Sequence, residues 1–114
     1  MQEGLLELKA IIGELSDVTV EVISNAKENP NEIGAASYPY TELVGLTLYC
    51  FMWQRIILAA VQAKAQKIGS VDYLEGLIKT GDFFMCRLLP KSKSLIAEIR
   101  AGAGPLMAMT AEQF

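Results

Sequence analysis

The chain has 114 residues, of which 52% are hydrophobic and 20% are charged, and its formal net charge is −3. This length suits one domain with a buried core, and this composition excludes a disordered or highly charged tail. The net charge and a sequence pI near 4.9 argue against nucleic acid as the main partner. We therefore expect residues 1–114 to form a single domain that does not bind nucleic acid.

The first predicted helix covers about residues 3–28. Its apolar residues recur at spacings of three and four, which is typical of an amphipathic helix. Asn29 and Pro30 end it, because proline restricts the preceding residue to extended conformations. The predicted buried seam, with a wider apolar flank, consists of Leu5, Leu8, Ile12, Leu15, Thr19 and Val22, and of Ile11, Val18 and Ala26.

The second predicted helix begins near Asn31 or Glu32 and runs to about Ile68, and Pro39 either marks its first turn or kinks an early segment. A helix with such a wide apolar face is expected to lie between neighbouring helices. The predicted apolar face consists of Leu43, Leu46, Thr47, Cys50, Phe51, Trp53, Ile57, Leu58 and Val61.

Residues 43–61 are the one stretch that resembles a membrane span. Gln54 and Arg55 interrupt it at its centre. An arginine at the centre of a bilayer costs about 2.5–3.5 kcal/mol on insertion scales. A central helix of a bundle is therefore favoured over a membrane span, and no membrane partner is expected. The first 29 residues are acidic and amphipathic, which is unlike a secretory signal.

The third predicted helix follows an N-cap at Ser70 and extends to about residue 101. Pro90 is expected to bend this helix without ending its apolar pattern. Gly102 ends it, and Thr110 caps a short turn over residues 111–114. The apolar positions of this helix are Leu74, Leu77, Ile78, Phe84, Met85, Leu88, Ser92, Leu95, Ile96 and Ile99.

These elements predict an all-α fold. Three long helices joined by short turns favour an antiparallel up-down bundle, with a short helical turn at the C-terminus.

The two cysteines, Cys50 and Cys86, both lie in apolar helical stretches. Such cysteines behave as small hydrophobic residues and fit a reducing environment better than a disulfide framework. A disulfide between them stays an alternative. We expect a cytoplasmic protein.

The charges are unevenly distributed along the chain. Residues 1–34 hold seven acidic and two basic residues, whereas residues 35–114 hold six acidic and eight basic residues. The favoured interpretation is that the first and third helices pack through complementary surfaces. The alternative is an anion site formed by Arg87, Lys91 and Lys93.

The chain lacks residues that several common catalytic mechanisms require. The chain has no histidine, which removes the commonest general base and histidine metal ligands. Glu14, Asp17 and Glu21 share a helix face, and a solvated face is favoured over a metal site. We assign no catalytic, cofactor-binding or metal-binding residue in this chain.

Two further alternatives concern ligands. The glycine-rich residues 102–104 could form a phosphate loop, but helix termination is favoured because these glycines follow a helix. The aromatic residues could line a ligand pocket, although core packing is favoured at helical spacing. These aromatic residues are Tyr38, Tyr40, Tyr49, Phe51, Trp53, Tyr73, Phe83 and Phe84.

An ordered series of features in the second half of the chain is distinctive. An aromatic pair precedes Leu-Leu-Pro, a long amphipathic run, a Gly-Ala-Gly turn, Leu-Met-Ala and a phenylalanine. These features are Phe83 and Phe84, Leu88, Leu89 and Pro90, residues 95–99, 102–104 and 106–108, and Phe114. Upstream, Tyr40 and Gly45 open a long apolar helix, with Glu42 where a basic residue is more usual. In this order the chain resembles the acetyl-CoA dehydrogenase-like C-terminal domain of the acyl-CoA dehydrogenases.

The resemblance implies a parent enzyme that binds FAD and oxidises acyl-CoA thioesters at their α,β-carbons. The base and the flavin contacts of that family belong to a catalytic core upstream, so none is carried over to this chain. These 114 residues would then be a non-catalytic C-terminal fragment that packs against the core, supports homo-oligomer contacts or covers part of the substrate entrance.

Two other hypotheses stay open. The wide apolar face of the second helix would suit a stand-alone module that associates with itself. A small apolar-ligand carrier with a pocket near Trp53 is the third hypothesis.

Overall fold

The structure, a computed structural model, describes the backbone of residues 2–114 and the side chains of residues 4–114. The described residues are helical and contain no strand, so the prediction of an all-α chain is confirmed. The elements are α1 (Gln2–Glu28), α2 (Asn31–Ala65), α3 (Val71–Phe83), a π-helical turn η1 (Phe84–Leu88), α4 (Lys91–Ala101), α5 (Gly104–Met107) and a 3₁₀ turn η2 (Ala111–Gln113).

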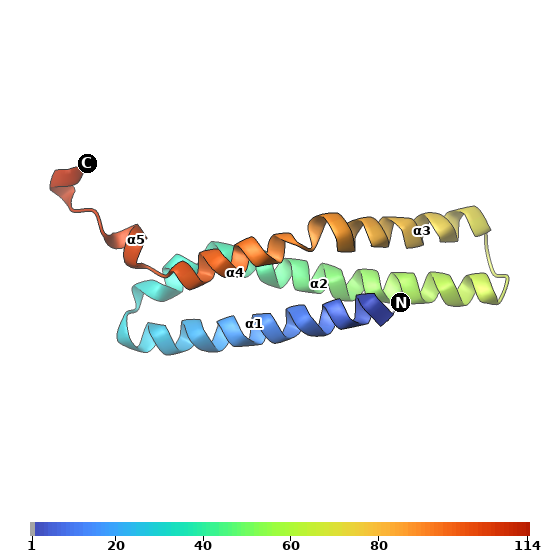
Figure 1. Ribbon diagram of the computed structural model, residues 1–114, viewed down its shortest axis with the longest axis horizontal. Helices are drawn as coiled ribbons and strands as arrows, with labels where there is room; N and C mark the ends of the chain where they lie inside the picture. Colours follow the sequence, from blue (N-terminus) through green and yellow to red (C-terminus); the bar gives the residue numbers. More distant parts are fainter. Residues whose placement is uncertain (1) are drawn as a thin grey trace.

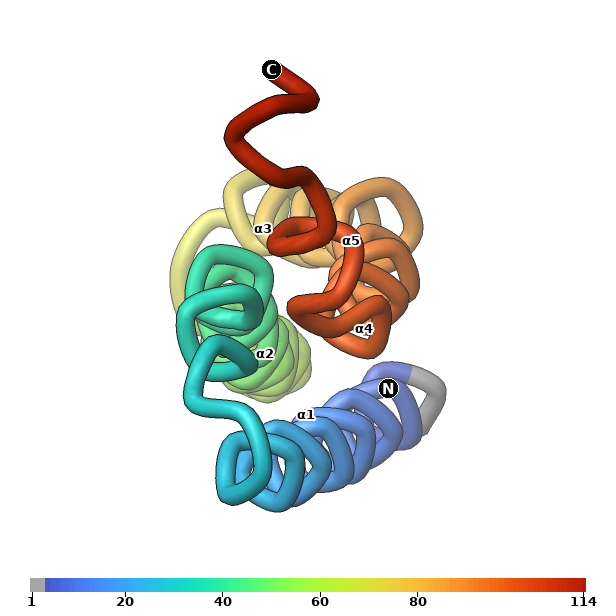
Figure 2. Tube along the Cα trace, turned by 90° about the vertical axis from the view of Figure 1, so that its left-hand side faces the viewer, coloured from blue at the N-terminus to red at the C-terminus, as the bar shows by residue number. Residues whose placement is uncertain are grey.

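Helix α2 is the central element of the fold. It contacts α1, α3 and α4, and α1 also contacts α4. Figure 1 shows that the chain reverses direction between α1 and α2 and again between α2 and α3. In the end-on view of Figure 2, α1, α2 and α4 surround a common centre, while the C-terminal segment projects away from them. The molecule measures 67 × 28 × 16 Å along its principal axes.

The turn between α2 and α3 ends the second helix earlier than predicted. Helix α2 ends at Ala65, and Lys67 adopts a positive φ of 57°. This left-handed conformation stops an α-helix before Ile68 can extend it. The Ser70 cap is confirmed, because its side chain accepts a hydrogen bond from the Tyr73 N–H at 3.4 Å.

The third predicted helix is not one continuous α-helix, which corrects the prediction. The Leu89 N–H donates to the Phe84 carbonyl at 2.9 Å, the five-residue spacing of a π turn. Pro90 has no N–H to donate to the preceding turn. The wider π turn before it separates α3 from α4, so the break begins one turn earlier than Pro90 itself.

The core is narrower than the sequence predicted. Val18, Leu43 and Cys50 are fully buried. By contrast, Leu5 and Ile12 of the predicted α1 seam are about half exposed, at 48% and 49%. Helix α1 faces its neighbours through a stripe centred on residues 8, 11 and 18, so the predicted seam is displaced around the helix. Three residues of the apolar faces predicted for the second and third helices are also exposed, namely Phe51, Leu58 and Leu88.

Candidate functional site

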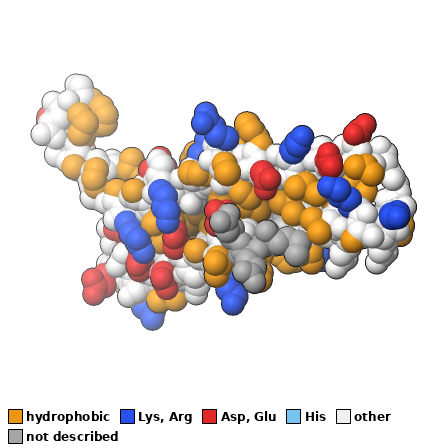
Figure 3. Space-filling view, turned by 45° about the vertical axis from the view of Figure 1, so that its right-hand side comes forward, with side chains coloured by type: hydrophobic (Ala, Val, Ile, Leu, Met, Phe, Trp, Pro, Cys, Tyr) orange, Lys and Arg blue, Asp and Glu red, His pale blue; other side chains and the backbone are white. Residues whose placement is uncertain are grey.

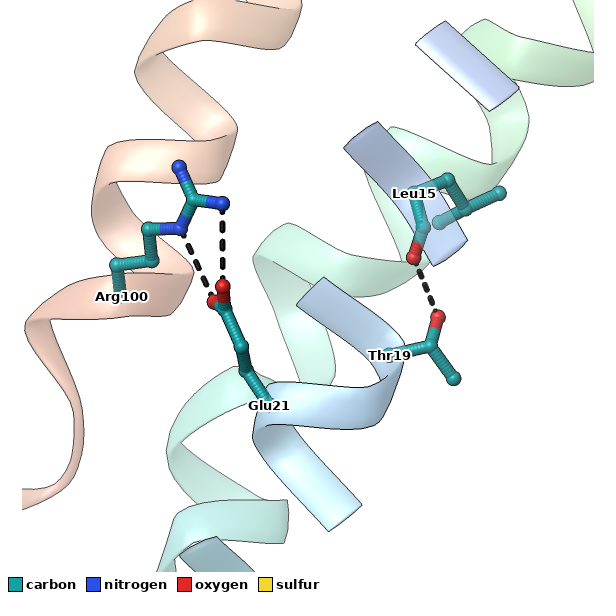
Figure 4. A network of polar contacts seen from close by, with 4 residues as sticks. All are labelled: Leu15, Thr19, Glu21 and Arg100. Atoms are coloured by element: carbon teal, nitrogen blue, oxygen red, sulfur yellow. Dashed lines mark hydrogen bonds and ion pairs between the residues drawn. The ribbon is translucent and has the colours of Figure 1, made fainter. Parts of the chain in front are cut away.

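The acidic face of α1 lies against basic residues of α4. Lys93 Nζ lies 2.7 Å from Glu14 Oε1. Arg100 Nε and Nη2 lie 3.0 and 3.2 Å from the two carboxylate oxygens of Glu21, as Figure 4 shows. The hydrogen bonds to Glu21 raise the pKa of Arg100 above its usual value. The predicted complementary packing of these two segments is therefore observed.

These ion pairs engage members of both charged clusters noted in the sequence. Glu14 and Glu21 are engaged by α4, and no group of three potential metal ligands occurs among the described residues. Lys93 is likewise engaged by Glu14. Arg87 and Lys91 are exposed side chains at the junction of η1 and α4. Glu14, Glu21 and Lys93 are therefore ion-paired members of the surface between α1 and α4.

The glycine-rich turn after α4 holds a carboxylate from the same chain. Gly102 has a positive φ of 75°, and the Ala103 N–H donates to Glu32 Oε2 at 3.1 Å. A Cβ on Gly102 would lie 3.3 Å from the same carboxylate. Helix termination is thus confirmed. The turn does not fit the diphosphate of FAD, because Glu32 already occupies the position that an anion would take.

The two cysteines differ in environment. Cys50 is fully buried and its Sγ lies 3.8 Å from Met85 Sδ. Burial raises the pKa of the Cys50 thiol. Cys86 is exposed, which corrects the expectation that both cysteines behave as small buried hydrophobic residues, and both thiols are free. The π turn directs Phe84 and Met85 into the core, and Cys86 consequently faces outward.

The aromatic residues differ in how deeply they are buried. Trp53 is half-buried and packs against the core. Tyr49 and Phe84 meet edge to face with ring centroids 6.5 Å apart. Tyr40 shares a 2.8 Å hydrogen bond with Thr19. Core packing therefore accounts for Tyr40, Trp53 and Phe84. The other five predicted aromatic residues are exposed, which corrects the expectation of core packing for them: Tyr38, Tyr49, Phe51, Tyr73 and Phe83.

An open groove between α1 and α2 is the most apolar candidate site. We call it the α1–α2 groove, and its volume is about 370 Å³. The hydrogen bond between Thr19 and Tyr40 lies within it. Six further residues line it: Val22, Ile23, Ile33, Ala36, Ser37 and Thr41. The sequence showed only that the apolar face of α2 was wide, because the partner stripe on α1 depends on how the two helices pack.

The kinds of side chain on the outer surface, charged or hydrophobic, differ between regions of the molecule. On the face in Figure 3, acidic and basic side chains adjoin over α1 and α4, and hydrophobic side chains gather toward the middle. Large apolar residues are also exposed on the C-terminal segment, where Leu106 is 70% and Phe114 93% exposed. Structure and surface together define an all-helical domain with candidate interaction surfaces.

The family comparison agrees with this description. The model of the family described as "Acetyl-CoA dehydrogenase C-terminal like" matches residues 1–110. The chain belongs to this family, and the resemblance noted in its sequence is confirmed. A comparison with curated proteins finds no match.

Proposed function

We propose that the chain is the C-terminal helical domain of an FAD-dependent acyl-CoA dehydrogenase. In this proposal the parent enzyme oxidises acyl-CoA thioesters at the α,β-carbons, and FAD is held by a catalytic core outside these residues. The domain itself is structural, packs on that core and supports a homo-oligomer in the cytoplasm. The family match over residues 1–110 is the observation that carries the proposal.

The dimensions of the chain support a role in packing against another body. Its Cα radius of gyration is 18.9 Å, against about 13 Å for a compact domain of this length. Its accessible surface is 7936 Å², against about 6200 Å² for a compact protein of this mass. The surplus exceeds the roughly 800 Å² that one partner buries in a standard interface.

Helix α2 is long and apolar enough to cross a membrane by length and composition alone, and 28% of its most apolar window is buried. The core helix of a bundle passes the same test. Its contacts with α1, α3 and α4, and the central Gln54 and Arg55, support the proposal that α2 belongs to a bundle outside the membrane.

The proposal is tested by the visible absorption spectrum of the complete product of the gene. We expect flavin bands that bleach when an acyl-CoA is added without oxygen. The 114-residue chain incubated with FAD and then separated from it should show neither the bands nor any dehydrogenation. A complete product without flavin, or flavin chemistry by the isolated chain, would contradict the proposal.

A stand-alone self-associating module is the second candidate function. Exposed apolar side chains on α2, such as Leu48 and Met52 at 58% and 50%, favour it. Sedimentation of the isolated chain tests it, and a strict monomer at micromolar concentration would count against it.

A further inference from the structure

One stripe of α1 combines exposed apolar residues with basic ones. Its members follow one another at spacings of three and four residues, so they share one helix face. They are Leu5, Lys9, Ile12, Ser16, Val20, Ile23 and Lys27, all exposed. The stripe contains no acidic residue. Glu14 and Glu21, by contrast, lie on the face that pairs with α4.

A second stripe on α2 has the same character. Its members also recur at spacings of three and four, and Arg55 lies over the Phe51 ring at 5.7 Å from its centroid. The stripe consists of Ile33, Ser37, Thr41, Val44, Leu48, Phe51 and Arg55. It again contains no acidic residue. The two acidic residues of α2 are engaged elsewhere, because Glu32 accepts from Ala103 and Glu42 accepts from the Tyr38 hydroxyl.

The two stripes meet at the α1–α2 groove. Ile23 from the first stripe and Ile33 from the second both line it. The helices keep this register along their length: Thr19 is bonded to Tyr40 near one end, and Gly4 lies against Gln54 at the other. The groove itself lies between residues 19–23 of α1 and residues 33–41 of α2. The two stripes continue beyond it along both helices, and they carry Lys9, Lys27 and Arg55.

The charges identify the kind of occupant. A second copy of this face would bring only bases to these bases, although the chain has 13 acidic residues. The groove is concave, with a volume of about 370 Å³, and this shape fits the ridge of a helix better than a flat lipid surface. We propose that the α1–α2 groove binds an amphipathic helix whose apolar stripe is flanked by carboxylates.

This inference rests on the proposed function, and there the helix belongs to the catalytic core of the parent enzyme. Its apolar ridge covers Leu48 and Ile12, and its carboxylates lie within ion-pair distance of Lys9, Lys27 and Arg55. Charge complementarity of this kind sets the orientation of the helix and excludes other partners.

Zero-length carbodiimide cross-linking of the complete gene product tests the inference, because it joins lysines only to adjacent carboxylates. We expect Lys9 and Lys27 to be linked to aspartates or glutamates that recur at helical spacing within one segment of the core. Lys91, which is exposed on α4, serves as the comparison and should not be linked to that segment.

Two matched charge reversals sharpen this test. Lys9→Glu with Arg55→Glu should lower the yield of the Lys27 cross-link about tenfold, the effect of weakened charge pairing. Arg87→Glu with Lys91→Glu makes the same change in net charge away from the groove and should leave that yield unchanged.

The contradicting outcomes are distinct. A gene product with no flavoenzyme core overturns both the proposed function and this inference. A flavoenzyme in which Lys9 and Lys27 are linked to no core segment overturns the inference alone. Links only between isotopically distinguished copies would identify a second copy as the occupant. Co-sedimentation with vesicles of phosphatidylglycerol and phosphatidylcholine, abolished by Lys9→Glu with Arg55→Glu, would identify a lipid surface instead.

Discussion

At the scale of single residues, Gly81 shows how closely α3 approaches α2. A Cβ at this position would lie 2.5 Å from Ile57 Cδ1 and 2.6 Å from Ile57 Cγ1. Ile57 is buried, so it has little room to move aside. We expect Gly81→Ala to lower the free energy of unfolding by about 1–3 kcal/mol through overpacking.

Gly76 in the same helix is the matched control, because a Cβ added there would have nothing within 4 Å of it. Gly76→Ala should raise the free energy of unfolding by about 0.5–1 kcal/mol, since alanine favours a helix over glycine. Urea unfolding followed by circular dichroism measures both. Equal stabilisation by the two substitutions would contradict the close approach at Gly81.

The two free thiols give a second prediction at this scale. A raised pKa leaves less thiolate at a given pH, and thiolate is the reactive form. We therefore expect a maleimide at neutral pH to label exposed Cys86 rapidly and buried Cys50 only when the chain unfolds. Mass spectrometry counts the labels. Rapid double labelling of the folded chain would show that the core around Cys50 is open.

At the scale of elements, the orientation of α1 distinguishes the structure from the sequence prediction. Val18 is fully buried and Val20 is 65% exposed. Val18→Ala should cost about 2 kcal/mol of stability through lost burial and the cavity left behind. Val20→Ala removes the same atoms and should change stability by less than about 0.5 kcal/mol. Similar losses in the two variants, measured by thermal unfolding, would place α1 in another rotation.

The contact between the start of α2 and the end of α4 is a further element-scale feature. Ala103 is buried, and its N–H donates to the Glu32 carboxylate. Glu32→Ala leaves this donor unpaired and should cost about 1–3 kcal/mol. Glu32→Gln keeps an oxygen acceptor and should cost less. If urea unfolding shows no loss in Glu32→Ala, water satisfies the Ala103 N–H equally well.

Local signals predicted most of the helix ends. Pro30 and Ser70 act on neighbouring backbone groups, and Gly102 adopts the positive φ that its place after a helix indicated. The π turn was not predicted, because Pro90 dictates only that a hydrogen bond is lost and not which turn absorbs the change. The sequence also could not predict that the buried seam of α1 is displaced around the helix. Spacing defines a wide apolar stripe, whereas packing on α2 and α4 selects the buried part of it.

At the scale of the whole molecule, exposed apolar surface is the feature on which the proposed interactions depend. The sequence favoured a second helix covered by its neighbours, and incomplete cover was only the ground for the self-association hypothesis. The exposure of Leu48, Phe51 and Met52 shows that this apolar face is covered only in part. The location of the groove could not be predicted, since it needs the register between two helices. The stripes beside the groove carry basic residues and no acidic ones, because the acidic face of α1 is turned toward α4 by the ion pairs of Glu14 and Glu21.

In the proposed function, this chain works as a packing domain of a larger flavoenzyme. The most direct measurement is the intact mass of the native gene product, together with its visible absorption. We predict a mass well above the 12.5 kDa of this chain and the absorption bands of bound flavin. A native product of about that 12.5 kDa mass without flavin would contradict the claim and favour the stand-alone module.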